Sequence, residues 1–364
     1  MKVDFKKAFS KKKIAAVLVV LLAVVVMVLS NPDIKNFFTD VESVKLSFET
    51  GVDYDTVTYG KDMLLVNNEG IYAMDKSGRE AWSVISAATS PAVQVKGDYI
   101  LLCDMNGKSV KTFRKEKTVA QIQTENEILC AKVNNNGYVA VATDELGYKG
   151  LVTLYDKDGD EVFKWHSGTG YIGDIDISSK NKIAVSQIVT NKEAVQSRIV
   201  IIDPKSKDEP KCIAELDGIV MKLSYRDGQK LVAVSGKGMY CFKDSGKSYF
   251  SVNFEGRTPL SCNIENENNM VVAFDGGLNN TILESYSAGG KLRGSYNSAH
   301  EIKAYDVSGE CILAVSIDGV VRLNPKGNVK KEMKLSKDVQ EIRIFSGRDR
   351  FLSLGGSSAE IIKF

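Results

Sequence analysis

The chain has 364 residues, 43% of them hydrophobic and 26% charged, with 30 Gly, 6 Pro, 6 Cys and only 2 His. This composition is that of a globular protein with enough chain to bury a core, and it excludes collagen, a disordered chain and a small disulfide-held scaffold. The formal net charge is +2, but residues 1–13 hold six lysines and one aspartate, so the remainder is mildly acidic. Because nucleic-acid binding depends on a concentrated basic face, we expect no nucleic-acid partner.

The first element in chain order is an apolar segment, IAAVLVVLLAVVVMVL, at residues 14–29. As a helix it would be about 24 Å long, which reaches across a bilayer core of about 30 Å when lysine side chains extend to the interface. The segment therefore predicts a membrane span. The predicted divisions are a cytoplasmic basic tail at 1–13, a transmembrane signal anchor at 14–31 that contacts the membrane through Ile14 to Leu29, and a linker at 32–42.

The charges around this segment predict its orientation. The block of six lysines at residues 2–13 lies entirely before it, and positively charged flanks stay in the cytoplasm. We therefore expect a single-pass protein of the cell membrane, with residues 33–364 outside the cytoplasm. A cleaved signal peptide is the alternative, although Val28-Leu29-Ser30 fits a cleavage site poorly and Pro32 lies beside it.

Six cysteines lie in the part that we expect outside the cytoplasm. None belongs to a CxxC motif, and most lie within apolar runs. Two alternatives stay open: buried free thiols, and one or more disulfides formed in an oxidising compartment. The cysteines are Cys103, Cys130, Cys212, Cys241, Cys262 and Cys311.

A unit of about 40 residues repeats along residues 55–364. Each unit has four short runs rich in Val, Ile, Tyr and Phe between clusters of Gly, Asn, Asp and Lys, which is the pattern of strands and turns. The first strands are centred on Val57, Val93, Leu129, Ile175, Leu223, Cys262, Tyr305 and Ile342. Four strands in about 40 residues are typical of a propeller blade. We predict an all-β, eight-bladed β-propeller over residues 43–364, with seven blades or a two-sheet β-sandwich array as the alternatives.

A hairpin with a glycine is predicted between the third and fourth strands of most units, since glycine adopts positive φ without steric cost. These hairpins lie at 74–82, 103–113, 155–165, 242–252, 286–296 and 324–333, and 202–210 takes the same place without a glycine.

The last unit has only three strands, EIRIF, RFLSL and AEIIKF, before the chain ends at Phe364. Upstream of the first unit, Ser43–Phe48 alternates polar and apolar residues and belongs to no unit of its own. We predict that this segment pairs with Ala359–Phe364 as the missing fourth strand. Such pairing closes the ring and removes an exposed edge.

The hairpins MDKSGREAW and YDKDGDEVFKW resemble those of quinoprotein-like, eight-bladed propellers, including the BamB lipoproteins. The order of a lysine-rich tail, one span and a propeller is similar to DUF5711, an uncharacterised family of bacterial, mostly clostridial, proteins. The resemblance covers about residues 40–364 and implies blade geometry rather than chemistry. The adjacent cysteines of quinone-binding members and the lipobox cysteine of BamB relatives are missing here, so neither activity is implied.

Three segments resemble phosphate-binding motifs. Gly168–Gly173 matches GxGxxG, but a strand pattern follows it where a dinucleotide site needs a helix. Gly246-Lys247-Ser248 and Gly107-Lys108-Ser109 lack the upstream glycine of a P-loop. We favour loops and hairpin turns for all three.

Asp156, Asp158 and Asp160 have the alternate spacing of a calcium loop, but the glycine and the glutamate of such a loop are misplaced. A hairpin turn is favoured over a weak surface Ca²⁺ site. The glycosylation sequon at Asn279-Asn280-Thr281 is interpreted as a turn.

Both histidines, His166 and His300, are candidates for a general base. They are three blades apart in the predicted propeller, and no GxSxG motif accompanies either, so loop positions are favoured. Trp82 and Trp165 occupy equivalent places after a hairpin, where packing between blades is favoured over an aromatic platform for a sugar or peptide.

No set of nucleophile, base or metal ligands converges in the sequence, so we predict no catalytic, cofactor-binding or metal-binding residues and no cofactor. The first hypothesis is a membrane-tethered extracytoplasmic propeller that acts as an interaction scaffold for an envelope protein or wall polymer, without catalytic activity. The second is a ligand-binding or hydrolytic propeller with its site at the central channel. The fold alone does not decide between them. Exposed apolar side chains on one face would favour the first, and carboxylates converging on an ion in the channel the second.

Overall fold

The computed structural model describes residues 42–46, 54–190, 194–226, 229–266, 268–335, 339–356 and 358–364. The chain divides into two compact units, Met1–Glu42 and Ser43–Phe364. The predicted basic tail, the signal anchor and all but the last residue of the linker lie outside the described residues. No helix in the described part of the chain combines the length and the apolar character needed to span a bilayer.

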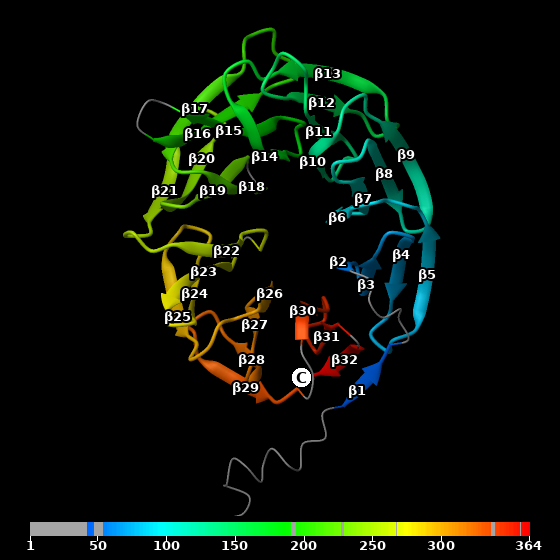
Figure 1. Cartoon of the computed structure of the whole chain (residues 1–364), viewed down its shortest axis with the longest axis vertical. Helices are drawn as coiled ribbons and strands as arrows, with labels where there is room; N and C mark the ends of the chain where they lie inside the picture. Colours follow the sequence, from blue (N-terminus) through cyan, green and yellow to red (C-terminus); the bar gives the residue numbers. More distant parts are fainter. Residues whose placement is uncertain are drawn as a thin grey trace, which may run out of the picture. The chain divides into compact units, whose positions relative to one another are not determined.

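The second unit consists of eight four-stranded antiparallel sheets, the blades, arranged around a central channel (Figure 1). Each blade uses four consecutive strands except the last, and blades 1 to 4 follow one another from residue 55 to residue 217. Their strands are β2 (Asp55–Tyr59), β3 (Asp62–Val66), β4 (Gly70–Met74) and β5 (Glu80–Ile85); β6 (Pro91–Lys96), β7 (Tyr99–Asp104), β8 (Ser109–Arg114) and β9 (Lys117–Gln123); β10 (Ile128–Val133), β11 (Val139–Thr143), β12 (Leu151–Tyr155) and β13 (Glu161–His166); and β14 (Tyr171–Ile177), β15 (Ile183–Thr190), β16 (Val195–Ile202) and β17 (Lys211–Asp217).

Blades 5 to 8 complete the ring. Their strands are β18 (Val220–Arg226), β19 (Lys230–Ser235), β20 (Gly238–Lys243) and β21 (Ser248–Asn253); β22 (Pro259–Asn263), β23 (Met270–Gly277), β24 (Asn280–Tyr286) and β25 (Leu292–Asn297); β26 (Ala304–Ser308), β27 (Cys311–Ser316), β28 (Gly319–Leu323) and β29 (Val329–Met333); and β30 (Val339–Ile344), β31 (Arg350–Gly355) and β32 (Ser358–Lys363) with β1 (Ser43–Lys45). Every predicted first strand lies where the sequence places it. The eight-bladed propeller is confirmed, and the seven-bladed and sandwich alternatives are wrong.

Blade 8 is built from both ends of the second unit. β1 pairs with β32 in antiparallel register, with Ser43 opposite Ile362 and Lys45 opposite Glu360, and the Leu46 amide donates to the Ala359 carbonyl at 2.9 Å. The expected pairing of Ser43–Phe48 is therefore present, with β1 at Ser43–Lys45 and one further hydrogen bond at Leu46, and residues 47 and 48 lie outside the described residues. Figure 1 shows β1 on the outside of blade 8, next to blade 1.

The hydrophobic core is divided among the blade junctions. Eight clusters of buried apolar side chains occur in the described residues, and each joins one blade to the next. Both faces of each sheet are therefore buried, which explains why second strands such as Val139–Thr143 are continuous apolar runs instead of alternating ones. A single blade has no complete core, so closing the ring is a condition for burying both end blades.

The hairpins between third and fourth strands follow the prediction in six blades, and the prediction for 103–113 is wrong. That segment joins β7 to β8, the second and third strands of blade 2, and a tight turn at Arg114–Lys117 joins the third strand to the fourth. The turn has no glycine, because Lys115 itself takes the positive φ of 53°. Both turns have hairpin chemistry, so composition alone did not separate them.

The hairpin glycines have a second role that the sequence did not reveal. A Cβ on Gly327 would lie 2.0 Å from the carbonyl oxygen of Ser295, and one on Gly290 would lie 2.5 Å from the Phe250 ring. In both cases the neighbour belongs to the fourth strand of the preceding blade. Glycine is therefore needed for the close approach of adjacent blades as well as for positive φ.

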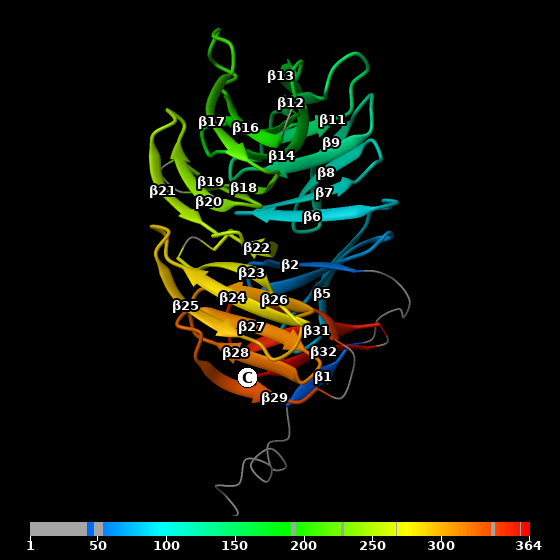
Figure 2. The same ribbon diagram turned by 60° about the vertical axis from the view of Figure 1, so that its left-hand side comes forward.

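The strands run between two faces of the ring (Figure 2). The hairpin face carries the connections from first to second and from third to fourth strands. The loop face carries the connections from second to third strands and from each blade to the next. Since Ser43 pairs near the end of β32, the chain enters the propeller at the hairpin face, where Phe364 also lies.

Candidate functional site

The wall of the channel is formed by the first strands of the blades (Figure 1). A first strand pairs with a second strand on one side only, so its other edge presents backbone N–H and C=O groups without a strand partner. Buried backbone groups need hydrogen-bond partners. In this channel many of the partners are side chains of the neighbouring blade.

These inter-blade contacts form a belt around the channel. Asp55 accepts a hydrogen bond from the Val93 amide at 3.2 Å, and Asp306 accepts one from the Ile344 amide at 2.7 Å. Each of the eight junctions has at least one such polar link. The other six are Gln94 to Val133, Asn134 to Ser178, Asp174 and Asp176 to Leu223 and Tyr225, Arg226 to Ile264, Ser261 to Tyr305, and Arg343 to Thr56.

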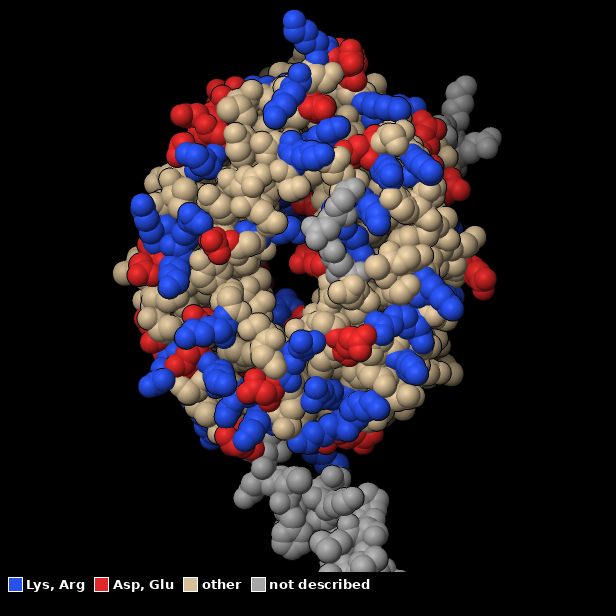
Figure 3. All heavy atoms as spheres, turned by 180° about the vertical axis from the view of Figure 1, so that it is seen from behind, with Lys and Arg blue, Asp and Glu red and all other residues tan. Residues whose placement is uncertain are grey.

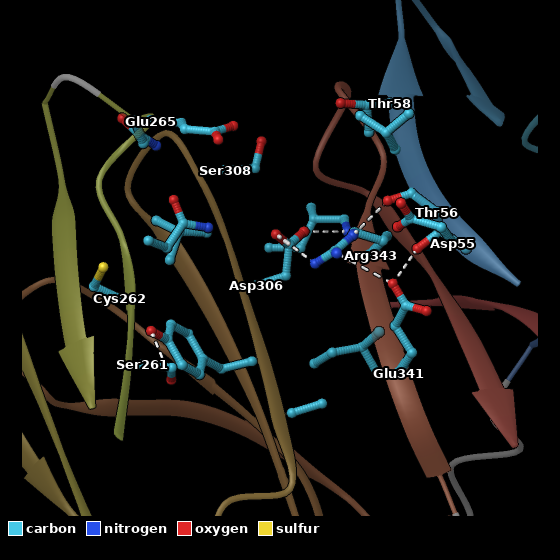
Figure 4. A pocket seen from close by; sticks show the side chains of 18 of the residues that line it. Asp55, Thr56, Thr58, Ser261, Cys262, Glu265, Asp306, Ser308, Glu341 and Arg343 are labelled. Atoms are coloured by element: carbon cyan, nitrogen blue, oxygen red, sulfur yellow. Dashed lines mark hydrogen bonds and ion pairs between the residues drawn. The ribbon is translucent and has the colours of Figure 1, made fainter. Parts of the chain in front are cut away.

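A cavity of about 830 Å³ lies in the channel against blades 6, 7, 8 and 1. Figure 4 shows that side chains from both sides of the cavity point into it, with Glu265 and Cys262 across from Arg343 and Glu341. Polar groups dominate the lining. The cavity is thus suited to hydrogen bonding rather than to an apolar ligand.

Arg343 is the centre of the charged side of this cavity. Its guanidinium donates to the Thr56 carbonyl at 2.9 Å and lies 3.1 Å from Glu341 and 3.7 Å from Asp306 (Figure 4). Burial raises the pKa of both carboxyl groups, although Arg343 lies between them and opposes that rise. The guanidinium is therefore committed to holding blades 7, 8 and 1 together.

Lys222 and Glu265 form the opposite charged pair, with 2.9 Å between Nζ and Oε1. Desolvation opposes ionisation of Glu265, but the neighbouring Lys222 ammonium outweighs it and lowers the pKa of the carboxyl group. Lys132 and Lys96 lower this pKa further from the other side of the channel. This wall of the channel consequently keeps its carboxylate charged at neutral pH.

The channel cysteines have raised thiol pKa values. Burial raises the pKa of the Cys262 thiol to about 11 and that of Cys130 to about 12, so neither is an activated thiolate near neutrality. In the described part of the chain no three His, Cys, Asp or Glu side chains are grouped as metal ligands. The lining provides hydroxyl, amide and charged groups that can orient a polar molecule.

The loop face differs from the rest of the surface in its exposed apolar side chains. Of fifteen exposed large hydrophobic residues in the described residues, eleven lie at this face. The other four, Val162, Tyr249, Leu292 and Val329, lie on fourth strands at the rim. The eleven are Ile85, Leu129, Leu146, Tyr148, Tyr171, Val195, Ile219, Met221, Leu260, Leu278 and Ile317.

Charged groups of both signs are spread over the surface rather than gathered in one field. Figure 3 shows one face of the ring with lysine, arginine and carboxylate side chains interspersed around an open channel. Acidic and basic groups are also visible on the channel wall in this view. No single basic field is visible on this face of the described residues.

The motifs that resemble phosphate and calcium sites are turns in the structure. Gly168–Gly173 spans the connection from β13 to β14 and the start of β14, and no helix follows it. Asp156 caps its own hairpin, because Oδ1 accepts hydrogen bonds from the amides of Asp158 and Asp160 at 3.0 Å each. The two Gly-Lys-Ser segments lie in the hairpins β7–β8 and β20–β21, and the sequon lies at the turn from β23 to β24.

The structure does not bring the histidines together. His166 ends β13, and its ring lies 4.5 Å from that of Tyr148, whereas His300 lies between β25 and β26, 3.4 Å from Asp318. Trp82 packs between blades 1 and 2 and Trp165 between blades 3 and 4, as the packing interpretation predicts.

The six cysteines are all free and lie in six different blades. Cys103, Cys241 and Cys311 are buried, Cys130 and Cys262 are half-buried beside the channel, and Cys212 is exposed on β17. Of the two alternatives from the sequence, the structure has the free thiols.

Sequence reasoning missed the segment Asp144–Gly150, DELGYKG, on the loop face. It is the longest of the connections from a second to a third strand, lying between Thr143 and Leu151. Its length in a repeat of otherwise short turns was the signal available in the sequence, because long loops in a compact repeat tend to be functional.

Together these features define a β-propeller whose blades are linked by polar groups around the channel and whose loop face carries the exposed apolar side chains. The chain matches the family described as "Family of unknown function (DUF5711)" over residues 36–364, and it belongs to that family. No curated protein matches the sequence.

Solved structures share the fold. BamB from Moraxella catarrhalis is 12% identical with a TM-score of 0.53, over 90% of this chain and 99% of that one. The C-terminal WD40 domain of Sif2 is 12% identical with a TM-score of 0.62, over 88% of this chain and 99% of that one. At these identities the likeness concerns the propeller architecture alone.

Proposed function

We propose that this protein is a membrane-tethered, extracytoplasmic propeller that acts as an interaction scaffold without catalytic activity, and that it binds an envelope protein through its loop face. The observation that carries the proposal is the uneven distribution of exposed apolar side chains, eleven of fifteen at one face. Exposed apolar surface is costly in water and marks sites where another molecule binds. The likeness to BamB and to the WD40 domain, at 12% identity each, shows the fold alone. That fold is compatible with a binding role.

The tether is the second part of the proposal and depends on the apolar segment at residues 14–29. In this proposal the lysines before the segment stay in the cytoplasm and residues 33–364 lie outside it. A reporter that is active only outside the cytoplasm, fused after Phe364, tests this orientation. We expect activity, and an inactive reporter in a stably produced fusion would contradict the topology.

The binding role is tested with a photo-crosslinking amino acid in the full chain, in its native membrane. We expect adducts from Ile219 and Leu260 on the loop face, but none from Lys157 and Lys247 on the hairpin face. Equal crosslinking from the two faces, or crosslinking from the hairpin face alone, would refute the assignment.

The cavity in the channel favours a second candidate function, the binding of a small polar ligand. Ser308→Tyr distinguishes the two, because it adds a ring that takes up part of the cavity, at a lining position away from the loop face (Figure 4). Under the scaffold proposal this variant keeps the loop-face adducts. If it removes them while the protein stays folded, a channel ligand is required and the second candidate is favoured.

A further inference from the structure

The segment Asp144–Gly150 holds one apolar side chain away from the body of the propeller. Leu146 has 96% of its surface exposed. The next residue, Gly147, has a φ of +85° with open space around the position of a Cβ. A leucine in this position gains nothing from the fold, because it buries no surface against it.

The base of this segment is fixed by backbone hydrogen bonds. The Asp144 amide donates to the Glu127 carbonyl at 3.0 Å, and the Lys149 amide donates to the Ser167 carbonyl at 2.8 Å. The Ser167 amide returns a bond to the Gly150 carbonyl at 2.8 Å. The exposed leucine therefore projects from a supported loop, which lowers the entropy cost of using it for binding.

Aromatic rings lie on both sides of the blade 3 to blade 4 junction, and one of them belongs to the same segment as Leu146. Tyr148 is 50% exposed, and its ring lies 4.5 Å from the ring of His166. Tyr171 is 58% exposed, and Lys149 lies 4.4 Å above its ring and donates to its hydroxyl at 2.9 Å. We call Leu146, Tyr148, His166 and Tyr171 the blade 3 patch.

Two connections that are joined to each other at this patch carry acidic side chains. Glu125 and Glu127 come from the connection that precedes β10, and Asp144 and Glu145 begin the protruding segment. Asn126 donates to Glu145 at 2.9 Å, which ties the two connections together. Lys149 donates to the Tyr171 hydroxyl, and Lys108 donates to the Glu125 carbonyl at 2.7 Å. Both ammonium groups keep their charge, so the four carboxylates leave a net charge of −2 on these connections.

We infer that the blade 3 patch binds a polypeptide segment that carries an apolar side chain flanked by lysine or arginine. The apolar side chain packs against Leu146 and the tyrosine rings, and the basic groups pair with the surrounding carboxylates. Anionic lipid surfaces, nucleic acids and anionic wall polymers carry the same sign of charge as this rim and are repelled. The inference rests on the proposed function, since it names the chemistry of the partner of the loop face.

The test uses the purified full chain in a neutral detergent and a displayed library of random 12-residue peptides as the probe. We expect selection to enrich peptides with Lys or Arg beside Leu, Phe or Trp. For the leading peptide, Leu146→Ser and the double variant Glu125→Lys with Glu127→Lys should each weaken binding at least about tenfold, a change of about 1.4 kcal/mol. Binding should also weaken as salt is added, because the rim is exposed.

Matched controls on the same face separate the patch from the face as a whole. Ile317→Ser and Glu301→Lys replace an exposed apolar residue and an exposed carboxylate in other blades, and each should change the affinity less than about twofold. All variants should keep the circular dichroism spectrum and melting temperature of the parent, because the replaced groups are exposed.

Three outcomes overturn the inference, and they identify what failed. Enrichment of acidic peptides, or of peptides indifferent to Leu146, contradicts the assigned chemistry. Peptides that depend on Ile317 place the binding site elsewhere on the loop face, which leaves the proposed function standing. Peptides that depend on no loop-face residue contradict both.

Discussion

The hairpin face and the loop face are built by the same eight sheets, yet they use their residues differently. On the hairpin face, carboxylates and amides are turned inward to cap the turns, as Asp75 does for the amides of Ser77 and Arg79 at 2.8 and 3.1 Å. On the loop face, apolar side chains such as Leu146 and Ile317 are exposed without a partner in the fold. Polar side chains on the hairpin face therefore stabilise the turns of the propeller, whereas exposed side chains on the loop face are available to contact a partner.

The largest difference between the two faces is expected in how much a glycine substitution lowers the free energy of unfolding. Gly327→Ala on the hairpin face should lower the free energy of unfolding by about 3 kcal/mol, because the residue has positive φ and its Cβ would overlap the Ser295 carbonyl. Gly256→Ala on the loop face should cost only about 1 kcal/mol, since φ is +81° but the space is open. Denaturant unfolding of both variants measures this, and equal losses would show that the blades do not need the close approach.

A smaller effect is expected at Glu284, a buried residue inside β24 that pairs with Arg257 from a loop-face connection. Arg257 pairs with it through two bonds of 2.6 and 3.1 Å, and the Tyr286 hydroxyl donates to it as well. Glu284→Gln should cost about 2 kcal/mol, less than a fully buried pair would, because Arg257 is partly exposed. Thermal unfolding measures the loss. The exposed pair of Arg293 and Glu310 is the control, and Glu310→Gln should cost less than about 0.5 kcal/mol.

The smallest effect is a difference in pH dependence between the hairpin face and the channel. Although burial opposes it, hydrogen bonds from Ser77 and Arg79 lower the pKa of Asp75 to about 2. Its contribution to stability is therefore present above about pH 4 and is lost as the pH falls toward 2. Burial instead raises the pKa of Asp176 in the channel, so its effect has the opposite sign. The folded state binds this proton more tightly than the unfolded state does, and stability from it falls as the pH rises from about 4 through the raised pKa.

Paired substitutions separate these two contributions. Asp75→Asn should remove the acid-side loss, and Asp176→Asn should remove the decline at higher pH while its amide oxygen still accepts from the Tyr225 amide. The measurement is the unfolding free energy of each variant from pH 3 to pH 7. A parallel change in both variants would show that the channel carboxylate is no more desolvated than the turn carboxylate.

The sequence predicted the ring well because the ring depends on local patterns. Apolar runs such as the one at Val139–Thr143 mark strands buried on both faces, and their spacing set the number of blades. It failed at 103–113, where a turn of the expected composition joins different strands. The belt of hydrogen bonds around the channel could not be predicted from the sequence. Asp176, for example, accepts a hydrogen bond from the backbone amide of Tyr225, which lies in the next blade. Exposure of Leu146 was also beyond it, because composition does not distinguish a buried leucine from an exposed one.

The position of β1 has a consequence for how the chain reaches its final form during synthesis. The strand that closes blade 8 is among the first parts of the propeller to leave the ribosome, and its partner β32 is the last. Until that partner arrives, the cluster that Leu46 joins has only its blade 1 members, such as Met63 and Leu65, and lacks those of blade 8. The search that brings β1 and β32 together spans nearly the whole chain. The ring therefore cannot close until β32 has been synthesised. A nascent chain that stalls before β32 should stay an open, protease-sensitive array of blades.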